Sequence, residues 1–417
     1  MKHQLVGSIL ASVVSTGISM ADTLVVPGEY GSIQSGISAA LSGDTVLVAP
    51  GIYYETINFQ GKDITVSSSG SADDTYIDGN VSSGSIVMFV SGETNTSILD
   101  GFTVRNGTAQ NGSGIFIASS SPRILNCIVT SNHSSNNGGG IYVETGGITL
   151  EDVIVSDNIS NSAGAGLYLK MSNGSMTGGS IEGNIGVNGA GMYLKDGDGP
   201  FEMTDVVVQQ NIASNNGGGV YAKNSPVTVD SCMFVENAAN NGGGWFSWSG
   251  GDANFTNCSF EGNTATNVGG AANIKSSTVE FDSCLFDSNI ADSDCNGTGA
   301  GAVLEIVNSA VTLTNPTMCE NYVCETDGDF SGDAPVIVGD ILECTTGIGA
   351  CCGGPACWEM DEETCLNGGG TWNGDATLCA TVTCEGSNSG CAADLNGNGS
   401  VEVLDIIELI SAWGACP

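Results

Sequence analysis

The stretch GGGIYVETGGITLEDVIVSDN, residues 138–158, decides how this chain folds. Within it, residues 148–158 alternate between apolar and polar side chains with a period of two, which is typical of a strand with one buried face. The glycines that precede this run and the Asp157-Asn158 pair that ends it are typical of turns. The stretch therefore predicts short strands joined by tight turns, without a helix.

The same pattern returns along the chain at a fixed interval. Its final asparagine has equivalents spaced by 26, 26, 26, 27, 26, 26, 26 and then 32 residues: Asn106, Asn132, Asn158, Asn184, Asn211, Asn237, Asn263, Asn289 and Asn321. Glycine motifs such as GAGLYL (Gly164–Leu169) and GGGWFS (Gly242–Ser247) recur in step. One such unit cannot bury its apolar face alone, so the units must stack into a continuous core.

Stacked units predict an all-β fold, a right-handed parallel β-solenoid with one coil of about 26 residues per repeat. Parallel stacking places equivalent residues about 4.8 Å apart, so a residue type that persists at one phase forms a column. Asparagine amides in such a column bond to one another, and asparagine also tolerates left-handed turns. The repeated asparagines are therefore predicted to form a ladder.

Four cysteines keep the phase of this ladder. Each stands five residues before a ladder asparagine, at Cys127, Cys232, Cys258 and Cys284. Val153 and Val206 occupy the same phase in other repeats, so these positions should point inward and the cysteines should be packed thiols. The alternative is a metal or redox site formed by the last three cysteines.

The beginning of the repeat region has its own pattern. Residues 30–41 predict a short amphipathic helix, which would cover the exposed core of the first coil. The pair Ile33-Gln34, the run SGDTVLVAPGIY (Ser42–Tyr53) and the motif Gly61–Ile64 resemble the start of the pectin-lyase-like superfamily. This resemblance covers about residues 23–325 and implies a right-handed parallel β-helix.

A narrower resemblance lies in the later repeats. The pattern FxxN occurs at Phe234–Asn237, Phe260–Asn263 and Phe286–Asn289, with GGG or GGA before each. It looks like the repeat pair of the chlamydial polymorphic outer-membrane proteins, which are adhesins. The likeness implies a β-helix exposed at a surface.

The first residues are typical of an export signal. Lys2 and His3 are basic, an apolar stretch follows from Leu5 to Ile18, and small residues precede Asp22. Residues 1–21 are therefore predicted to be a signal peptide, and no later stretch is apolar enough to span a membrane. The mature protein is expected to be secreted, either extracellular or held at the cell surface.

The formal charge of −38 limits the possible partners. Such an acidic surface repels nucleic acid and anionic polymers but attracts cations. Binding to nucleic acid is therefore not expected.

The regular repeat ends near Asn321, and the remaining sequence predicts three further segments. With residues 22–325 as the β-helix, residues 326–348 are expected to be a cap or linker and residues 349–390 a cysteine-rich module. Six cysteines in this module (Cys351, Cys352, Cys357, Cys365, Cys379 and Cys384) predict disulfides in an exported chain, and a zinc site is the alternative. Trp358 and Trp372 are expected to form the small core of the module, or else to stack on a sugar ring.

The segment 391–417 contains the strongest chemical motif, DLNGNGSVEVLD. Oxygen-bearing residues occupy positions 1, 3, 5, 7, 9 and 12 of this loop: Asp394, Asn396, Asn398, Ser400, Glu402 and Asp405. Gly399 stands at position 6, where a calcium loop turns sharply, so these residues are predicted to bind calcium. The segment resembles one dockerin repeat, which implies a role in attachment and a cohesin-like partner.

Catalysis is not the favoured interpretation. The body holds two arginines, Arg105 and Arg123, and one histidine, His133, and none belongs to a recognisable catalytic cluster. The pairs Asp196/Asp198 and Asp292/Asp294 are expected to be solvated acidic turns, with paired acids or calcium ligands as the alternative. The sequence favours a β-helix that binds or scaffolds at an extracellular polysaccharide or cell-surface component. The alternative is a polysaccharide lyase or glycoside hydrolase.

Overall fold

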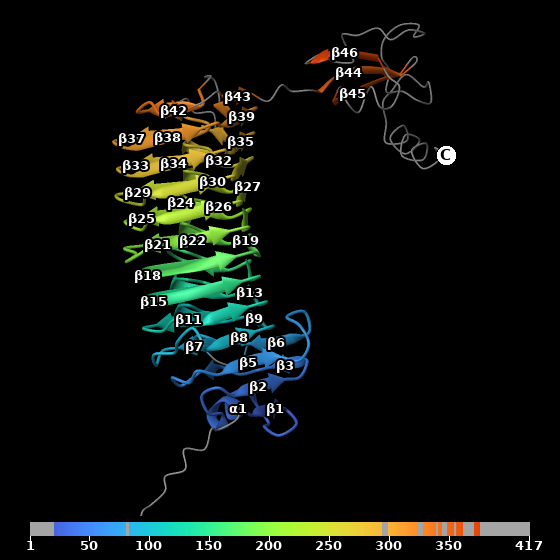
Figure 1. Cartoon of the computed structure of the whole chain (residues 1–417), viewed down its shortest axis with the longest axis vertical. Coiled ribbons are helices and arrows are strands. Elements are labelled where there is room, and N and C mark those ends of the chain that lie inside the picture. Colours follow the sequence, from blue (N-terminus) through green and yellow to red (C-terminus); the bar gives the residue numbers. More distant parts are fainter. Residues whose placement is uncertain are drawn as a thin grey trace, which may run out of the picture. The chain divides into compact units, whose positions relative to one another are not determined.

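The computed structural model describes residues 21–80, 83–293, 299–323, 328–338, 341–343, 348–353, 356–361 and 371–375. The chain forms an all-β parallel β-solenoid of about 12 turns, with about 26 residues per coil (Figure 1). The predicted fold class is thus confirmed. The chain divides into two compact units, Met1–Glu202 and Met203–Pro417, which are described in turn.

Unit 1 contains three parallel sheets, named A, B and C. Sheet A contains β1 (Thr23–Val26), β2 (Thr45–Val48), β4 (Ile57–Asn58), β5 (Thr65–Ser68), β7 (Val87–Phe89), β8 (Ile98–Asp100), β11 (Ile115–Ala118), β12 (Arg123–Leu125), β15 (Ile141–Glu151), β18 (Leu167–Thr177) and β21 (Met192–Lys195). Sheet B contains β3 (Gly51–Tyr53), β6 (Thr75–Asp78), β9 (Thr103–Arg105), β13 (Ile128–Thr130), β16 (Ile154–Ser156) and β19 (Ser180–Glu182). Sheet C contains β10 (Thr108–Asn111), β14 (His133–Asn137), β17 (Ile159–Ser160) and β20 (Ile185–Asn188).

Unit 2 repeats this plan, and β22 (Phe201–Thr204) spans the division. Its sheet A contains β25 (Val220–Lys223), β26 (Val227–Asp230), β29 (Trp245–Trp248), β30 (Ala253–Thr256), β33 (Ala272–Lys275), β34 (Thr278–Asp282), β37 (Leu304–Val307), β38 (Ala310–Thr314), β41 (Phe330–Gly332) and β42 (Val336–Val338). Its sheet B contains β23 (Val207–Gln209), β27 (Met233–Val235), β31 (Ser259–Glu261), β35 (Leu285–Asp287), β39 (Thr317–Cys319) and β43 (Leu342–Glu343). Its sheet C contains β24 (Ile212–Asn216), β28 (Ala238–Asn241), β32 (Thr264–Val268), β36 (Ile290–Ala291) and β40 (Tyr322–Val323).

A separate three-stranded antiparallel sheet follows the last coil. It contains β44 (Ile348–Gly353), β45 (Ala356–Asp361) and β46 (Thr371–Asp375), with β44 in the centre. These strands are the described part of the predicted cysteine-rich module.

The asparagine ladder is present in both units. In unit 1, the backbone N–H and side-chain Nδ2 of Asn158 both donate to Oδ1 of Asn184, at 3.0 and 3.1 Å. In unit 2, Asn237 donates in the same way to Asn263, at 3.1 and 3.0 Å. These four side chains are fully buried. The prediction that asparagines one coil apart form a column is therefore confirmed within each unit.

The structure corrects one reason given for these asparagines. Among the ladder residues in the described chain, only Asn106 has a positive φ, at 64°. The left-handed conformation is instead taken by the residue before the asparagine, as in Asp157 (φ 53°) and Glu236 (φ 51°). That residue makes the sharp turn between sheets B and C. The asparagine is required for its inward amide, which bonds to the neighbouring coil.

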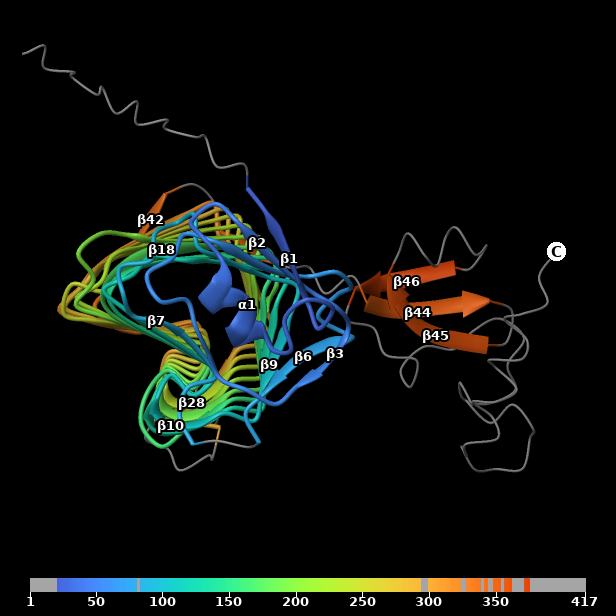
Figure 2. The same cartoon turned by 90° about the horizontal axis from the view of Figure 1, so that it is seen from below.

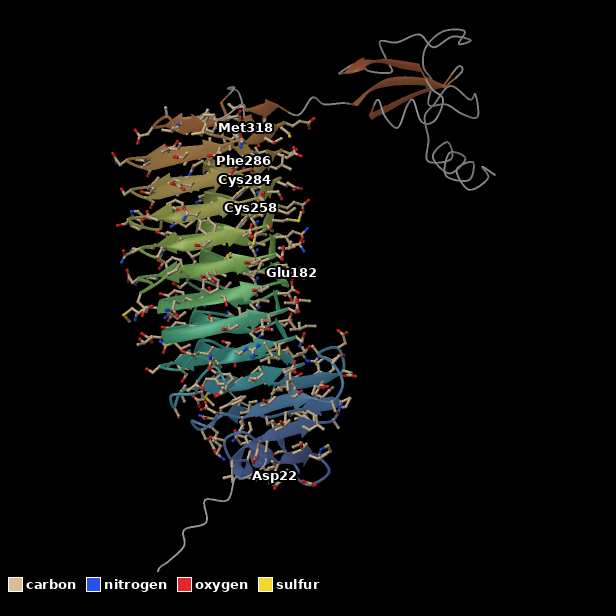
Figure 3. The ribbon with its side chains drawn as sticks, viewed as in Figure 1. Asp22, Glu182, Cys258, Cys284, Phe286 and Met318 are labelled. Atoms are coloured by element: carbon tan, nitrogen blue, oxygen red, sulfur yellow. The ribbon has the colours of Figure 1, made fainter. Side chains whose placement is uncertain are left out.

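The core of unit 2 is a stack of aromatic rings. Phe234, Phe260 and Phe286, the phenylalanines of the FxxN motif, are fully buried one coil apart, with ring centroids 4.7 and 5.3 Å apart. Figure 3 shows Phe286 and Met318 in successive coils, where Met318 continues this column through the pairing of β35 with β39. The motif therefore encodes core packing.

The four in-phase cysteines are buried free thiols, as predicted. Figure 3 shows Cys258 and Cys284 in successive coils of unit 2. Burial raises the pKa of Cys127 and of Cys232 to about 12, so both thiols stay protonated at neutral pH. A protonated thiol is neither a metal ligand nor a good nucleophile, which favours the packing role for these two cysteines.

The predicted amino-terminal helix is present and spans Ile33–Ala39. The Ser32 side chain accepts a hydrogen bond from the Ser35 N–H, and the carboxylate of Glu55 accepts from the Ile33 and Gln34 N–H groups. At the other end, Lys62 Nζ donates to three backbone carbonyls of the helix segment. Polar backbone groups at both ends of the helix therefore have hydrogen-bond partners. The helix, α1, lies across the interior of the first coils (Figure 2).

Seven residues are too few to cross a bilayer. The described residues contain no helix that meets the length and apolarity a membrane span needs.

The fit of α1 against the first coil gives a prediction. A Cβ on Gly36 would lie 2.8 Å from Val46 Cγ1 and 3.2 Å from Val26 Cγ2. Gly36→Ala gains about 1 kcal/mol of helix propensity, but overpacking a core costs about 1–3 kcal/mol. We therefore expect the variant to have a lower free energy of unfolding, as measured by urea titration. Gly31→Ala is the control, because its Cβ meets nothing within 4 Å, and a stabilised Gly36→Ala would contradict the prediction.

Candidate ligand-binding site

The predicted calcium ligands are not among the residues that the structure describes. Asp394, Asn396, Asn398, Ser400, Glu402 and Asp405 all lie outside these residues. Within the described part, no group of three or more His, Cys, Asp or Glu side chains is arranged to hold a metal. The calcium site therefore stays a prediction from sequence.

The arginines of the body are paired with carboxylates on other coils. Arg105 Nε lies 2.8 Å from Asp78 Oδ2, and Arg123 Nη2 lies 2.7 Å from Glu151 Oε1. Burial opposes ionisation of Asp78, but hydrogen bonds from Arg105 and Asn106 hold its pKa below the usual value. An arginine engaged in this way is a poor candidate for a catalytic base.

The structure corrects the interpretation of one acidic turn. Asp292 is only 1% exposed, so the expectation that it lies in a solvated turn is wrong. The chain returns at Gly299 and passes directly over it, since a Cβ on Gly299 would lie 2.3 Å from Asp292 Cβ. The following residue of the predicted pair, Asp294, lies outside the described residues.

Unit 1 contains an open cavity of about 740 Å³ on its surface. It is lined by Ser83, Gly84, Ser85, Thr108, Ala109, Gln110, Asn111, Phe116, His133 and Ser135. Strand β10 supplies one wall, β14 another and the start of β11 a third, while the chain at Ser83–Ser85 runs antiparallel beside Thr108. The lining thus gathers residues from successive coils.

Most of the surface that lines this cavity is apolar, and its polar groups include no acidic or basic side chain other than one histidine. Its lining holds hydroxyl, amide and imidazole groups around one aromatic ring, without a carboxylate, a lysine or an arginine. Such groups bind hydroxyl-rich, neutral molecules through hydrogen bonds and ring contacts. His133 Nε2 lies 3.4 Å from Asn161 Oδ1, and the His133 side chain is exposed.

The aromatic ring of the cavity belongs to a stack along sheet A. Phe116, Tyr142, Tyr168 and Tyr193 stack with ring centroids 5.4, 5.2 and 5.2 Å apart. The three tyrosines are buried, which raises their pKa values, to about 12 for Tyr168, so they remain neutral phenols. Phe116 is only half-buried and its neighbour on the other side is Met88, so its ring keeps surface for a ligand.

Unit 2 carries a second candidate, on the outer face of its sheet A. Trp245 packs in the core against Phe255, with centroids 4.8 Å apart, so the alternating residues Phe246 and Trp248 face outward. Trp248 is 44% exposed, and Lys223 Nζ lies 4.6 Å from the centre of its ring. The Lys223 ammonium therefore makes a cation–π contact with this exposed indole.

The outward column that contains Phe246, beside Trp248, has a polar residue in place of an aromatic one in the next coil. Asn273 pairs in register with Phe246 on one side and Glu305 on the other. Asn273 is fully buried, and neither its Oδ1 nor its Nδ2 has a hydrogen-bond partner among the residues that the structure describes. An unsatisfied buried amide costs about 1–3 kcal/mol, so it marks a strained or functional position.

Glu305 follows Asn273 in the same column. Burial raises the pKa of this carboxyl, Lys275 opposes the shift, and Ser331 Oγ donates a hydrogen bond to Oε2. Sequence reasoning did not single out Trp248, Asn273 or Glu305. The signal was available for Asn273, because GGAANIK (Gly269–Lys275) carries asparagine at the phase where other repeats carry tyrosine or phenylalanine.

Residues 89–260 match the family model described as "Right handed beta helix region". No curated protein matches the chain.

Two solved structures are similar to this β-helix chain at low identity. One is a mannuronic acid specific polysaccharide family 6 lyase from the human gut microbiota, with 12% identity, a TM-score of 0.38, and coverage of 76% of this chain and 82% of that chain. The other is ORF18 of Geobacillus virus E2, with 14% identity, a TM-score of 0.36, and coverage of 78% of this chain and 62% of that chain.

Proposed function

We propose that this protein is an exported β-helix that binds neutral carbohydrate at the cell surface or in the extracellular space. The observation that carries the proposal is the uncharged cavity of unit 1. Its volume of about 740 Å³ suits a few sugar units, and its hydroxyl and amide groups match sugar hydroxyls as donors and acceptors. The half-exposed ring of Phe116 offers a face for the apolar side of a pyranose.

Electrostatics support a neutral ligand over an anionic one. The chain carries a formal charge of −38, and the cavity has no cationic side chain to offset it. An anionic polymer would be repelled at long range and would meet no counter-charge on contact. The exposed Trp248 in unit 2 supports a second contact with a sugar ring.

The proposal predicts that two cavity side chains carry the affinity. Gln110 and His133 are exposed and line the cavity, so the double variant Gln110→Ala/His133→Ala should fold normally. Its affinity for the oligosaccharide should fall by at least about tenfold, because each lost hydrogen bond removes about 1 kcal/mol of binding free energy. The measurement is calorimetric titration with the best neutral oligosaccharide from a glycan array.

Two further variants locate the site. Trp248→Ala removes the exposed indole of unit 2, and Asn254→Ala changes an exposed outward residue of the same sheet as a matched control. Loss of binding with Trp248→Ala alone would move the site to unit 2. If no neutral glycan on the array binds the protein, the proposal is contradicted.

Turnover of the glycan is the second candidate, and Glu305 favours it. Burial raises the pKa of its carboxyl, which is the direction required of a general acid. The same oligosaccharide is incubated with the protein, and reducing ends and unsaturated products are measured. Product that disappears in Glu305→Gln would make the protein an enzyme, whereas binding without product supports the scaffold role.

We further propose that the tail, residues 391–417, binds calcium and attaches the protein to a cohesin-like or other surface partner. The support is the spacing of six oxygen-bearing residues around Gly399. Calorimetric titration of the full chain with calcium should show a site with Kd of about 1 mM or tighter. Asp394→Ala should abolish the heat and Asp361→Ala should leave it unchanged. A titration without heat for the unaltered chain would contradict the prediction.

A further inference from the structure

The basic side chains of unit 2 lie at one place on its surface. After residue 202 the sequence contains two lysines, Lys223 and Lys275, and no arginine. Lys223 pairs in register with Trp248, and Trp248 pairs in register with Lys275. The three residues stand on β25, β29 and β33, which Figure 1 shows in successive coils. Both lysines therefore flank one exposed indole, and the set of three is called the lysine–tryptophan site.

Neither lysine is neutralised by an ion pair within the described residues. The ion pairs found there belong to three other basic side chains, all in unit 1. Glu305 is the carboxyl that Lys275 influences. Burial raises the pKa of Glu305 and the charge of Lys275 opposes this rise, but no ion pair joins the two groups. Both ammonium groups thus keep their N–H donors for another partner.

Aromatic rings hold both ammonium groups in place. Lys223 Nζ lies 4.6 Å from the centre of the Trp248 ring, and Lys275 Nζ lies 5.8 Å from the centre of the Phe246 ring. Each lysine is half-buried, so its alkyl stem packs along sheet A while its ammonium group reaches solvent. A side chain that is already ordered loses less entropy when it binds a ligand, so these contacts prepare the site.

The indole has an open face on the side of Lys275. Lys223 belongs to the preceding coil and lies over the ring from that side, so it covers one face. Trp248 is nevertheless 44% exposed. The exposed surface therefore lies at the outer edge of the ring and on the face that points to the coil of Lys275. A flat ring that contacts this surface would meet the Lys275 ammonium at its rim.

The three side chains together define the chemistry of a ligand. An indole contacts the apolar face of a saccharide ring, and an ammonium group donates charge-assisted hydrogen bonds to a sulfate or carboxylate. Two lysines beside one indole therefore favour a ring that carries an acid group. The formal charge of −38 opposes this only weakly at physiological salt, because charges more than about 8 Å away are largely screened.

We propose that the lysine–tryptophan site binds an anionic saccharide. The saccharide ring stacks on Trp248, and its sulfate or carboxylate accepts hydrogen bonds from Lys275, while Lys223 holds the indole and adds positive charge. The site lies in unit 2 and does not require that the cavity of unit 1 binds carbohydrate.

Three probes that share one ring test the site: methyl glucoside, its 6-sulfate and methyl glucuronide. Their affinities for the full chain are measured by saturation-transfer NMR at about 0.15 M salt. We expect at least one of the two acidic probes to bind at least about fivefold more tightly than methyl glucoside, because a hydrogen bond to a charged group is stronger than one between neutral groups. Comparison of the sulfate with the glucuronide shows which acid group the site prefers.

Variants locate the preference at the site. Lys275→Gln should remove it and leave the affinity for methyl glucoside unchanged, whereas Lys275→Arg keeps the charge and should retain it. Trp248→Ala should weaken binding of the acidic probes. Arg123→Gln is the control, because it removes one positive charge from unit 1, where that charge is paired with Glu151, and it should change no affinity. Circular dichroism checks that each variant is folded.

Equal affinities for the three probes, or no binding of either acidic probe, would overturn the proposal. A preference for the acidic probes that survives Lys275→Gln would also overturn it, because the acid group would then be bound elsewhere. Failure of the neutral-carbohydrate proposal is observed separately, as an array on which no neutral glycan binds, and it leaves these comparisons unchanged.

Discussion

Replacing Asn263 by alanine should reduce the free energy of unfolding by about 3–5 kcal/mol, because it removes four buried hydrogen bonds at once. The Asn263 Oδ1 accepts from the backbone N–H and the Nδ2 of Asn237, and its Nδ2 donates to Phe234 O and to Asn289 Oδ1, at 2.8 and 3.0 Å. After the change, the Asn237 N–H loses its acceptor in a residue that has no exposed surface.

Urea unfolding of the full chain, followed by far-ultraviolet circular dichroism, measures this loss. Asn254→Ala is the matched control, because Asn254 is exposed on sheet A and the same change there should cost less than about 0.5 kcal/mol. A loss below about 1 kcal/mol for Asn263→Ala would show that the ladder is not a main source of stability.

The second large effect is expected at Phe260. Its ring is fully buried and lies 4.7 Å from Phe234, 5.4 Å from Phe255, 5.8 Å from Phe281 and 5.3 Å from Phe286, between ring centroids. Phe260→Ala leaves a cavity between neighbours that cannot collapse, because each is held by its own coil. A buried Phe→Ala change costs about 3–5 kcal/mol.

The variant Phe260→Leu distinguishes the contribution of filled core volume to stability from the contribution of ring stacking. Leucine keeps most of the volume and loses the ring contacts, so it should cost about 1–2 kcal/mol. The same urea titration measures both variants. Equal losses for alanine and leucine would contradict the account in which the filled volume dominates.

Much of this fold could be predicted from the sequence because a solenoid is almost one-dimensional. Equivalent residues lie over one another, so a shared phase in the sequence already states the contact in space. The ladder of Asn237 and Asn263, the stacked FxxN phenylalanines and the buried thiols all follow from phase alone.

Local detail was harder to predict where one residue type serves two purposes. Asparagine both tolerates a left-handed turn and offers an amide, and only the structure shows that the preceding residue takes the turn. Asp292 looked solvated because its neighbours are polar, yet the chain at Gly299 covers it. A return of the chain across a residue leaves no periodic trace in the sequence.

The sequence by itself determined the coil length and the phase of the asparagine and cysteine columns, because each depends on intervals along the chain. The tertiary structure alone decided where a surface cavity lies. The cavity joins Ser85, Gln110 and His133 from successive coils, and the amide of Asn273, which has no partner among the described residues, stands where the previous coil carries Phe246. Both depend on the directions of side chains in three dimensions, which an interval along the chain does not specify.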